Sequence, residues 1–501
     1  MHRTLTIAAC AFLALAAPAF AQSTLRIGLA EDPDILDPSI ARTYVGRIVF
    51  AGLCDKLVDI DKDLKLVPQL ATEWSWSADQ RQLTFKLRGD ASFHDGERFD
   101  ADAVKYNFER HLNLPESRRK TEISQVQSVD IVDRLTVRLN LEVPFAPLIA
   151  QLTDRAGMML SPKAAKAMGA QFGANPVCSG PYKFAERVQQ DRIVLERFKE
   201  HWNKAAYSFD RVVYLPIVDN TVRLANLKSG QIDLAERLAA TDIETVRKEA
   251  KLTVYSVVSL GYRDILINVA NGERAKNPLG QDKRVRQALE LAIDRDAINQ
   301  VVFNGSFQPG NQWVSPKSPW YAKGAPVPKR DLVKAKALLK EAGVTAPGFT
   351  LMVPNNNETL QVAQVIQAMA AEAGFEVKLQ AMEFATSLEH SAKGDFEAYL
   401  IGWSGRADPD GNLHAFVSCA GAQNDGRYCD KEMDALLDKS RSTNDIEQRL
   451  LAYDQVARKL EVDRPLIYLY HDQLFWVAAK RLVGFNAVPD GMARLAGLRF
   501  E

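Results

Sequence analysis

Short segments in which apolar and polar residues alternate, or in which a few apolar residues stand together, recur along most of the chain. Alternation with a period of two is typical of strands that bury one face, and short apolar runs are typical of buried strands. The pattern predicts strands at 24–29, 82–87, 128–141 with a turn near Asp133, 192–198, 211–217, 252–258, 264–269, 349–353, 376–381, 396–402 and 466–469.

Between these segments, apolar residues recur every three to four positions, which is the spacing of one face of a helix. Capping residues strengthen several of these helices, since Asp100 begins one of them while Gly230 and Gly343 end two others. The pattern predicts helices at 100–111, 221–229, 282–304, 331–342, 360–373, 431–440 and 445–461.

The alternation of strands and helices predicts an α/β fold with mixed sheets and helical crossovers. The segment 271–281 is polar and rich in Gly and Asn, so it is a candidate crossover. We therefore expect two α/β lobes, one before and one after about residue 270. A cleft between two lobes is where ligands usually bind.

The first 21 residues differ from the rest of the chain. Arg3 is the only charge before an apolar run from Ile7 to Ala17, and a Pro-Ala-Phe-Ala segment ends at Ala21. This order is typical of a secretory signal that is cleaved after Ala21. The run is too short to cross about 30 Å of hydrocarbon as a membrane anchor. A lipoprotein signal at Cys10 is disfavoured, because only a few apolar residues precede that cysteine.

No later segment has eighteen uninterrupted apolar residues, so we expect a soluble protein in the bacterial periplasm. The 501 residues include 63 Lys and Arg against 63 Asp and Glu, and the formal net charge is zero. Removal of the signal takes away one arginine and leaves a net charge of −1. Without a basic excess, the chain has no field to hold a nucleic-acid backbone, and nucleic acid is not an expected partner.

Four cysteines follow the signal, at positions 54, 178, 419 and 429. An exported protein meets an oxidising compartment, in which disulfides form. None of the four stands in a C-x-x-C pair, and the seven histidines lack H-x-x-x-H spacing. A zinc site is therefore not expected, and neither is a cofactor.

Motifs of catalysis are absent or incomplete. The segment 402–406 (GWSGR) lacks the last glycine of G-x-S-x-G, and the chain contains no P-loop and no G-x-G-x-x-G after a strand. The segment 408–412 (DPDGN) suggests a calcium loop, but Cys419 stands where a bidentate glutamate is required. These observations favour a binding protein. An exported hydrolase acting on peptides or glycans is the alternative, with Asp408 and Asp410 as a possible carboxylate pair.

Several segments, taken together, resemble one protein family. The run 69–97 contains L-A-x-x-W, T-F-x-L-R and F-H-D-G, and it is followed by SGPY at 179–182. Asn268, the segment 282–295 (DKRVRQALELAIDR) and the G-W…D-P-D pattern of 402–410 come next in order. In these positions the chain resembles the extracytoplasmic solute-binding proteins of ABC importers, in the class that binds dipeptides, oligopeptides or nickel. The matches span nearly the whole mature chain.

The resemblance implies two lobes that close over a solute about a hinge, with a subdomain inserted near the N-terminus. It implies lobe I at 22–56, 182–268 and 481–501, the inserted subdomain at 57–181, and lobe II at 269–480. It also implies an ABC permease at the inner membrane as partner and no catalytic group. We expect the receptor to be a monomer.

Site residues follow from the same resemblance. Asp408 resembles the aspartate that dipeptide-binding members use to hold the α-ammonium group of their ligand. Trp403 is expected to offer an aromatic wall and Arg406 to meet a carboxylate. The expected ligand-binding set is completed by Asn355, Tyr262 and Trp313.

The cysteines are expected to form two disulfides. Cys419 and Cys429 resemble a disulfide pair that follows the G-W…D-P segment in peptide binders. The two cysteines that remain, Cys54 and Cys178, are predicted to form the second bridge.

The chain departs from the dipeptide-binding members after the strand at 349–353. Those members have an arginine there that holds the peptide carboxylate, whereas this chain has asparagines at 355–357. Asparagine amides bind amides or hydroxyls instead. The departure puts free dipeptides in doubt and leaves longer or modified peptides, or another small amine-bearing solute. A nickel chelate is a further alternative, for which His414 and His471 are candidate imidazole ligands in lobe II.

Overall fold

The computed structural model describes residues 23–501. The predicted signal at 1–21 lies outside the described residues, and so do its predicted cleavage site after Ala21 and the cysteine at position 10. Within 23–501, no helix is long and apolar enough to cross a membrane.

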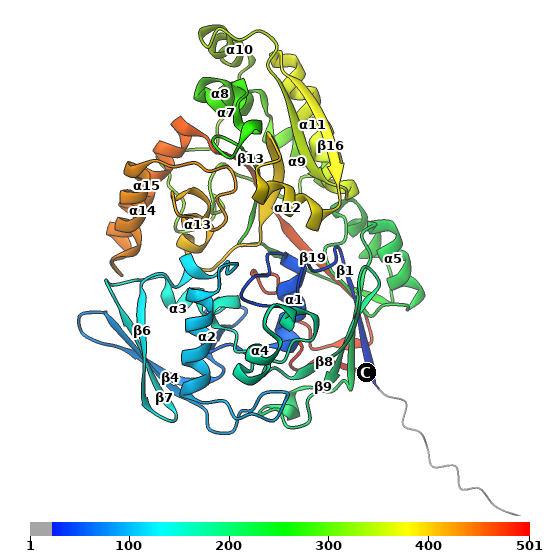
Figure 1. Cartoon of the computed structure of the whole chain (residues 1–501). Helices are drawn as coiled ribbons and strands as arrows, with labels where there is room; N and C mark the ends of the chain where they lie inside the picture. Colours follow the sequence, from blue (N-terminus) through cyan, green and yellow to red (C-terminus); the bar gives the residue numbers. More distant parts are fainter. Residues whose placement is uncertain (1–22) are drawn as a thin grey trace, which may run out of the picture.

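Two large mixed sheets form the body of the molecule, one in the lower and one in the upper part of Figure 1. The lower, seven-stranded sheet has the order β12 (Leu252–Val258), β19 (Gln473–Ala479), β11 (Leu234–Ala235), β1 (Thr24–Leu29), β10 (Arg211–Pro216), β9 (Arg192–Arg197) and β8 (Tyr182–Val188). The upper, six-stranded sheet has the order β14 (Gln308–Pro309), β18 (Leu466–His471), β13 (Tyr262–Ile267), β17 (Ala398–Trp403), β15 (Gly348–Pro354) and β16 (Glu376–Met382).

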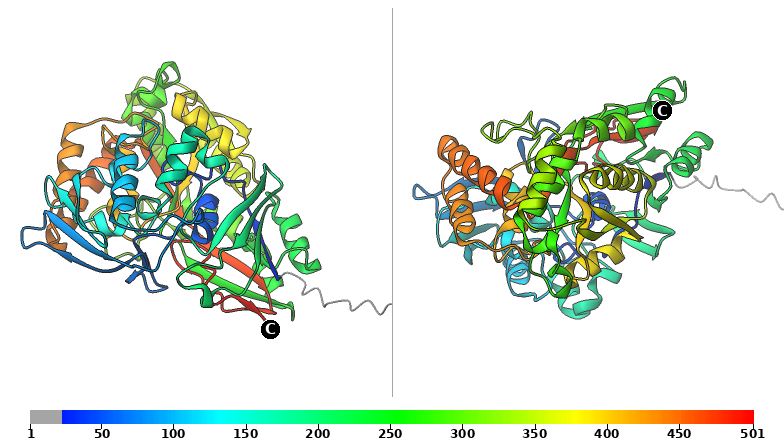
Figure 2. Two further views of the ribbon diagram at one scale, coloured as in Figure 1. Left: turned by 60° about the horizontal axis from the view of Figure 1, so that its bottom comes forward. Right: turned by 90° about the horizontal axis from the view of Figure 1, so that it is seen from above.

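A third, four-stranded sheet projects from the lower half, away from the seven-stranded sheet (Figure 2, left). Its order is β4 (Ala71–Trp76), β5 (Gln82–Leu87), β7 (Thr136–Leu141) and β6 (Val126–Asp133). Helix α2 (Ala101–Asn113) packs on it through Val104 and Phe108, which share an apolar core with Phe85 and Leu139. Two short hairpins complete the strands: β2 (Val58–Ile60) with β3 (Leu66–Pro68), and β20 (Leu482–Val483) with β21 (Arg499–Phe500).

Helices cover both faces of the six-stranded sheet. Against one face lie α8 (Lys283–Ala292), α9 (Arg295–Phe303), α10 (Leu332–Glu341) and α11 (Asn357–Ala373). Against the other lie α12 (Phe384–Lys393), α13 (His414–Val417), α14 (Lys431–Arg441) and α15 (Ile446–Asp463). The remaining α-helices are α1 (Tyr44–Leu53), α3 (Leu148–Gln151), α4 (Pro162–Met168), α5 (Asn220–Ser229), α6 (Ile243–Val246) and α7 (Pro278–Gln281).

The chain passes directly between the two large sheets at residues 259–261 and at Asp472, where β12 is followed by β13 and β18 by β19. These crossings lie a few residues from the expected lobe limits at 268 and 480, and the limits themselves stay predictions. The first crossing is tightly packed, because a Cβ on Gly261 would lie 1.9 Å from the carbonyl oxygen of Trp403. One apolar core, with Ile265 and Val477 among its members, continues from one sheet to the other.

Most predicted elements are present. The strands expected at 24–29, 82–87 and 252–258 match β1, β5 and β12 residue for residue. The single helix expected at 282–304 was wrong, because α8 ends at Ala292 and α9 begins at Arg295. Ile293 is extended between them, and the side chain of Asp294 accepts a hydrogen bond from the Ala297 amide as the N-cap of α9. An aspartate that bonds the local backbone favours a helix start over a helix interior.

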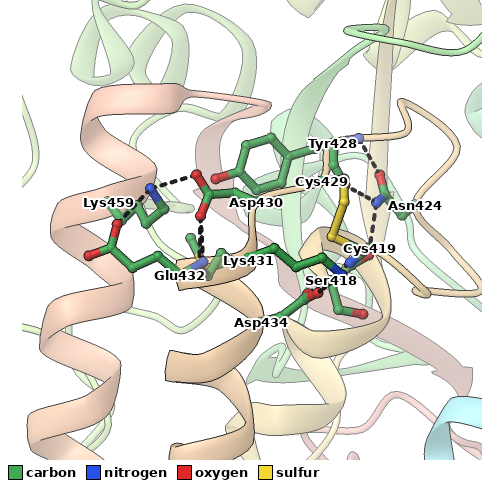
Figure 3. The surroundings of a disulfide bond; sticks show 11 residues. Ser418, Cys419, Asn424, Tyr428, Cys429, Asp430, Lys431, Glu432, Asp434 and Lys459 are labelled. Carbon is green, nitrogen blue, oxygen red and sulfur yellow. Dashed lines mark hydrogen bonds and ion pairs between the residues drawn. A yellow bond between two sulfur atoms is a disulfide. The ribbon is translucent and has the colours of Figure 1, made fainter.

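Both predicted disulfides are present. Cys54, which caps the C-terminus of α1, is joined to Cys178, 124 residues away. Cys419 is joined to Cys429 across a separation of 10 residues (Figure 3). The first bridge therefore ties distant parts of the chain together, whereas the second closes a local loop.

We expect the Cys54→Ser/Cys178→Ser variant to lose more stability than the Cys419→Ser/Cys429→Ser variant. Closing the two loops removes unfolded-state entropy worth about 5 and about 2.7 kcal/mol, respectively. Urea unfolding of the mature variants measures the difference in the free energy of unfolding. In the unfolded wild type without reductant, titration should find no reactive thiol, and two or more would contradict the paired cysteines.

Candidate functional site

A cavity lies between the two large sheets, beside the points where the chain crosses from one to the other. The empty space within its outline, the open solvent at its mouth included, is about 900 Å³. Tyr262, Asp264 and Leu266 line it from alternate positions of β13, as expected for one face of a strand. Glu31 and Tyr44 line it from the half that contains the seven-stranded sheet.

Aromatic rings form one side of this cavity. The ring centroids of Trp403 and Phe416 are 4.9 Å apart, and those of Tyr262 and Phe416 are 6.2 Å apart. The Trp403 indole nitrogen donates to the Gly411 carbonyl at 3.0 Å, and the Tyr262 hydroxyl donates to the Asn412 carbonyl at 3.1 Å. Because their polar atoms are already used, both residues offer apolar ring surface to a ligand. The structure thus places two of the predicted ligand-binding residues, Tyr262 and Trp403, on the cavity wall.

The loop closed by the second disulfide supplies another part of the wall. Its Gln423 and Asp425 line the cavity. The Asn424 side chain donates to the carbonyl oxygens of Ser418, at 2.9 Å, and Tyr428, at 2.6 Å, and so braces the loop from inside (Figure 3). The disulfide and Asn424 together hold Asp425 in place.

Three of the four acids on the cavity wall have a cation partner. Asp425 pairs with Arg42 at 2.9 Å, Asp472 pairs with Arg263 at 2.9 Å, and Glu31 pairs with Arg237 at 3.3 Å. The Arg42 pair links the segment after β1 to the loop at 419–429, so it joins the two halves across the cavity.

Asp264 is the exception. Its side chain is 2% exposed, and no hydrogen bond or ion pair joins its carboxylate to any residue of 23–501. Burial raises the pKa of Asp264 well above its usual range, and the charge of Arg263 opposes this only in part. Sequence reasoning missed Asp264 as a site residue, because it is the first residue of the predicted strand at 264–269 and so looks like a polar strand end. A single acid on the otherwise apolar face of this strand is the sequence feature that could have revealed it.

Arg406 lies behind the aromatic wall. Its guanidinium carbon is 4.3 Å from the centroid of the Trp403 ring, and its Nη2 is 3.5 Å from Oδ1 of Asp154. Asp154 also accepts hydrogen bonds from Nε of Arg47 at 2.6 Å and from Nε of Arg155 at 3.2 Å. Burial alone would raise the pKa of Asp154, but the charges of Arg406, Arg47 and Arg155 hold it well below its usual range.

The cluster around Asp154 contains more positive than negative charge. Arg119, which pairs with Glu122 at 2.6 Å, and Arg155 both donate to the carbonyl oxygen of Ala41. Four buried arginines therefore face three acids, Asp154, Glu122 and Asp490, and the last of these also pairs with Arg494. Nitrogen atoms without a partner remain on Arg119, Arg155 and Arg406. None of these four arginines lines the cavity, so the cluster lies behind its wall.

The other predicted ligand-binding residues lie elsewhere. Asp408 is 2.7 and 2.9 Å from the guanidinium of Arg449, and it also caps the turn at Asp410. Trp313 is fully buried beside Tyr453, and Asn355 is exposed after β15. None of the three lines this cavity, so ligand contact by them stays a prediction. The sequence could not reveal the Asp408 pair, because its partner is 41 residues away.

No group of three or more His, Cys, Asp or Glu side chains among residues 23–501 is arranged to hold a metal ion. Nε2 of His414 is bonded to Arg441, and Nδ1 of His471 to the Gly261 carbonyl.

Comparison with known proteins identifies the family and the fold. Residues 65–424 match the family described as bacterial extracellular solute-binding proteins, family 5 middle region. The chain is 32% identical to the glutathione-binding protein GsiB of Pectobacterium atrosepticum over 491 residues, which cover 95% of this chain and 94% of the relative.

Solved structures agree with this match. The dipeptide-binding protein of Pseudoalteromonas sp. SM9913, in complex with Met-Leu, has a TM-score of 0.88 at 23% identity and covers 95% of this chain and 100% of its own. The oligopeptide-binding protein AppA of Bacillus subtilis, in complex with a nonapeptide, has a TM-score of 0.85 at 25% identity and covers 94% and 97%. The expected two-lobed α/β fold of periplasmic binding proteins is confirmed.

We expect Asp154→Asn to destabilise the protein by about 3–5 kcal/mol, because three buried guanidinium groups lose their shared counter-charge. The free energy of unfolding in urea measures this effect. Asp63→Asn is the control, since the Asp63–Lys62 pair is exposed and its loss should leave stability unchanged. Equal stabilities of the two variants would contradict the central role of Asp154.

Proposed function

We propose that this chain, which belongs to the bacterial extracellular solute-binding proteins of family 5, is the periplasmic receptor of an ABC importer for a peptide-like solute. The observation that carries the proposal is the cavity between the two large sheets, whose wall is built from both halves of the molecule. The predicted signal at 1–21 supports export to the periplasm. The receptor would deliver its solute to the permease subunits at the inner membrane.

The chemistry of the cavity supports a solute with both polar and apolar parts. Tyr262 and Trp403 offer ring faces, and Gln423 and Asp425 offer polar groups. Glutathione, a small peptide with two carboxylates and one ammonium group, is the solute named for the GsiB relatives. It is therefore the first compound to test, followed by short peptides.

Closing of the two halves over the solute would couple binding to transport. The two halves are joined across the site by polar contacts, among them Arg42 to the Leu388 carbonyl at 3.1 Å and Arg118 to the Ala422 carbonyl at 2.8 Å. A solute that contacts both halves binds the closed arrangement better than the open one, and so shifts the population towards closure. The closed surface is what a permease would then recognise.

We expect glutathione or short peptides to bind the mature protein without being changed. At a concentration of 100 times Kd, the solute should add about 2.7 kcal/mol to the free energy of unfolding. Calorimetry measures Kd, and chromatography after incubation tests for products. A product formed in proportion to protein would contradict the receptor and favour a hydrolase.

Trp403→Ala should weaken solute binding, because it removes the ring that forms the wall. Trp320→Ala is the matched control, since Trp320 packs against Arg449 and Tyr453 and does not line the cavity. Equal Kd values for the two variants would contradict the placement of the solute in this cavity.

A further inference from the structure

We propose that Asp264 binds the cationic group of the solute, an alkylammonium group, inside the cavity. The inference rests on the proposed function and names the residue that selects for an amine-bearing solute. It assigns to a β13 residue the role that the sequence resemblance suggested for Asp408.

The first support is that Asp264 has no partner within the described chain. A buried carboxylate is costly unless it is paired with a cation or bound by hydrogen-bond donors. Asp264 has neither, although it is 98% removed from solvent. By contrast, Asp408 already has two hydrogen bonds from Arg449.

The second support is that no cation of the cavity wall is free to serve Asp264. Arg263, its neighbour on β13, is bound by Asp472 through both Nε and Nη2. Arg42 is bound by Asp425, and Arg237 by Glu31 and Glu236. No lysine of residues 23–501 lines the cavity. A positive charge beside Asp264 would therefore come from a molecule that enters the cavity, and its approach would favour the ionised carboxylate.

The third support is the position of Asp264 relative to the arginine excess. In the paired strands, Asp264 lies beside Ile401, and Tyr262 lies beside Trp403, two residues or about 6.6 Å farther along. Arg406 follows beyond Trp403 and contacts its ring. Along this strand pair, charge thus changes from negative at Asp264 to positive at Arg406. Because Arg406 lies behind the Trp403 ring and does not line the cavity, this order suits a solute whose ammonium group faces Asp264 and whose other end lies against the Tyr262 and Trp403 rings.

The first experiment compares wild type with Asp264→Asn, an isosteric change that removes the charge. The probes are glutathione and N-acetylglutathione, and a mixture of di- to pentapeptides before and after N-acetylation. We expect the wild type to prefer the free amines, and Asp264→Asn to raise their Kd by about ten- to a hundredfold, as for a lost hydrogen bond to a charged group. The Kd of the acetylated probes should be similar in the two proteins. Unchanged Kd values for the free amines would overturn the proposal.

The second experiment needs no solute. In the ligand-free protein, Asp264→Asn should keep or raise the thermal midpoint, because an unpaired buried acid stabilises nothing. Asp233→Asn is the matched control, since Asp233 is equally buried but pairs with Arg26 and Arg481, and its loss should lower the midpoint. A fall for Asp264→Asn as large as that of the control would show a structural role and overturn the proposal.

The two experiments separate this inference from the proposed function. If native mass spectrometry shows that the wild type retains neither glutathione nor any peptide, the peptide-like solute is rejected. The thermal comparison of Asp264→Asn with wild type then still tests the role of Asp264. An unchanged or raised midpoint of the variant supports a site for a cation of another class. A fall as large as that of Asp233→Asn overturns the inference.

Discussion

The carboxylate of Asp154 is the point on which the arrangement of this molecule depends. It meets Arg47 from the helix that follows β1, Arg155 from its own segment, and Arg406 from the segment after β17. All of these groups are removed from water, so each guanidinium is tolerated only while the carboxylate stays ionised beside it. Because Arg406 also lies on the ring of Trp403, this charge cluster holds the aromatic wall of the cavity in place.

The same cluster explains why charge is unevenly distributed about the cavity. Four arginines face three acids on one side of Trp403, and Asp264 stands without a base on the other. Both arrangements are unfavourable for folding alone, and such violations of local rules are expected at functional sites. In the proposed role of Asp264, an amine-bearing solute would compensate the second of them.

The periodicity of apolar residues was sufficient for most of the fold, because β5 buries every second residue and β1 buries most of its apolar ones. It failed between α8 and α9, where Asp294 bonds the local backbone within a pattern that continues without a break. The candidate site was harder to predict. Tyr262 and Trp403 lie on the cavity wall as expected, but the partners of Asp408 and the isolation of Asp264 depend on contacts between distant segments. No local pattern contains that information.

Equal totals of 63 basic and 63 acidic residues describe this protein poorly, because the charges that matter for binding are the few removed from solvent. An exposed pair such as Lys62 and Asp63 is screened by water and salt, and it contributes to neither specificity nor closure. Asp264 is 2% exposed and is screened less than a surface group, so in its proposed role a single positive charge beside it would discriminate between solutes. A receptor with almost no net field can thus diffuse and dock freely while its cavity remains selective.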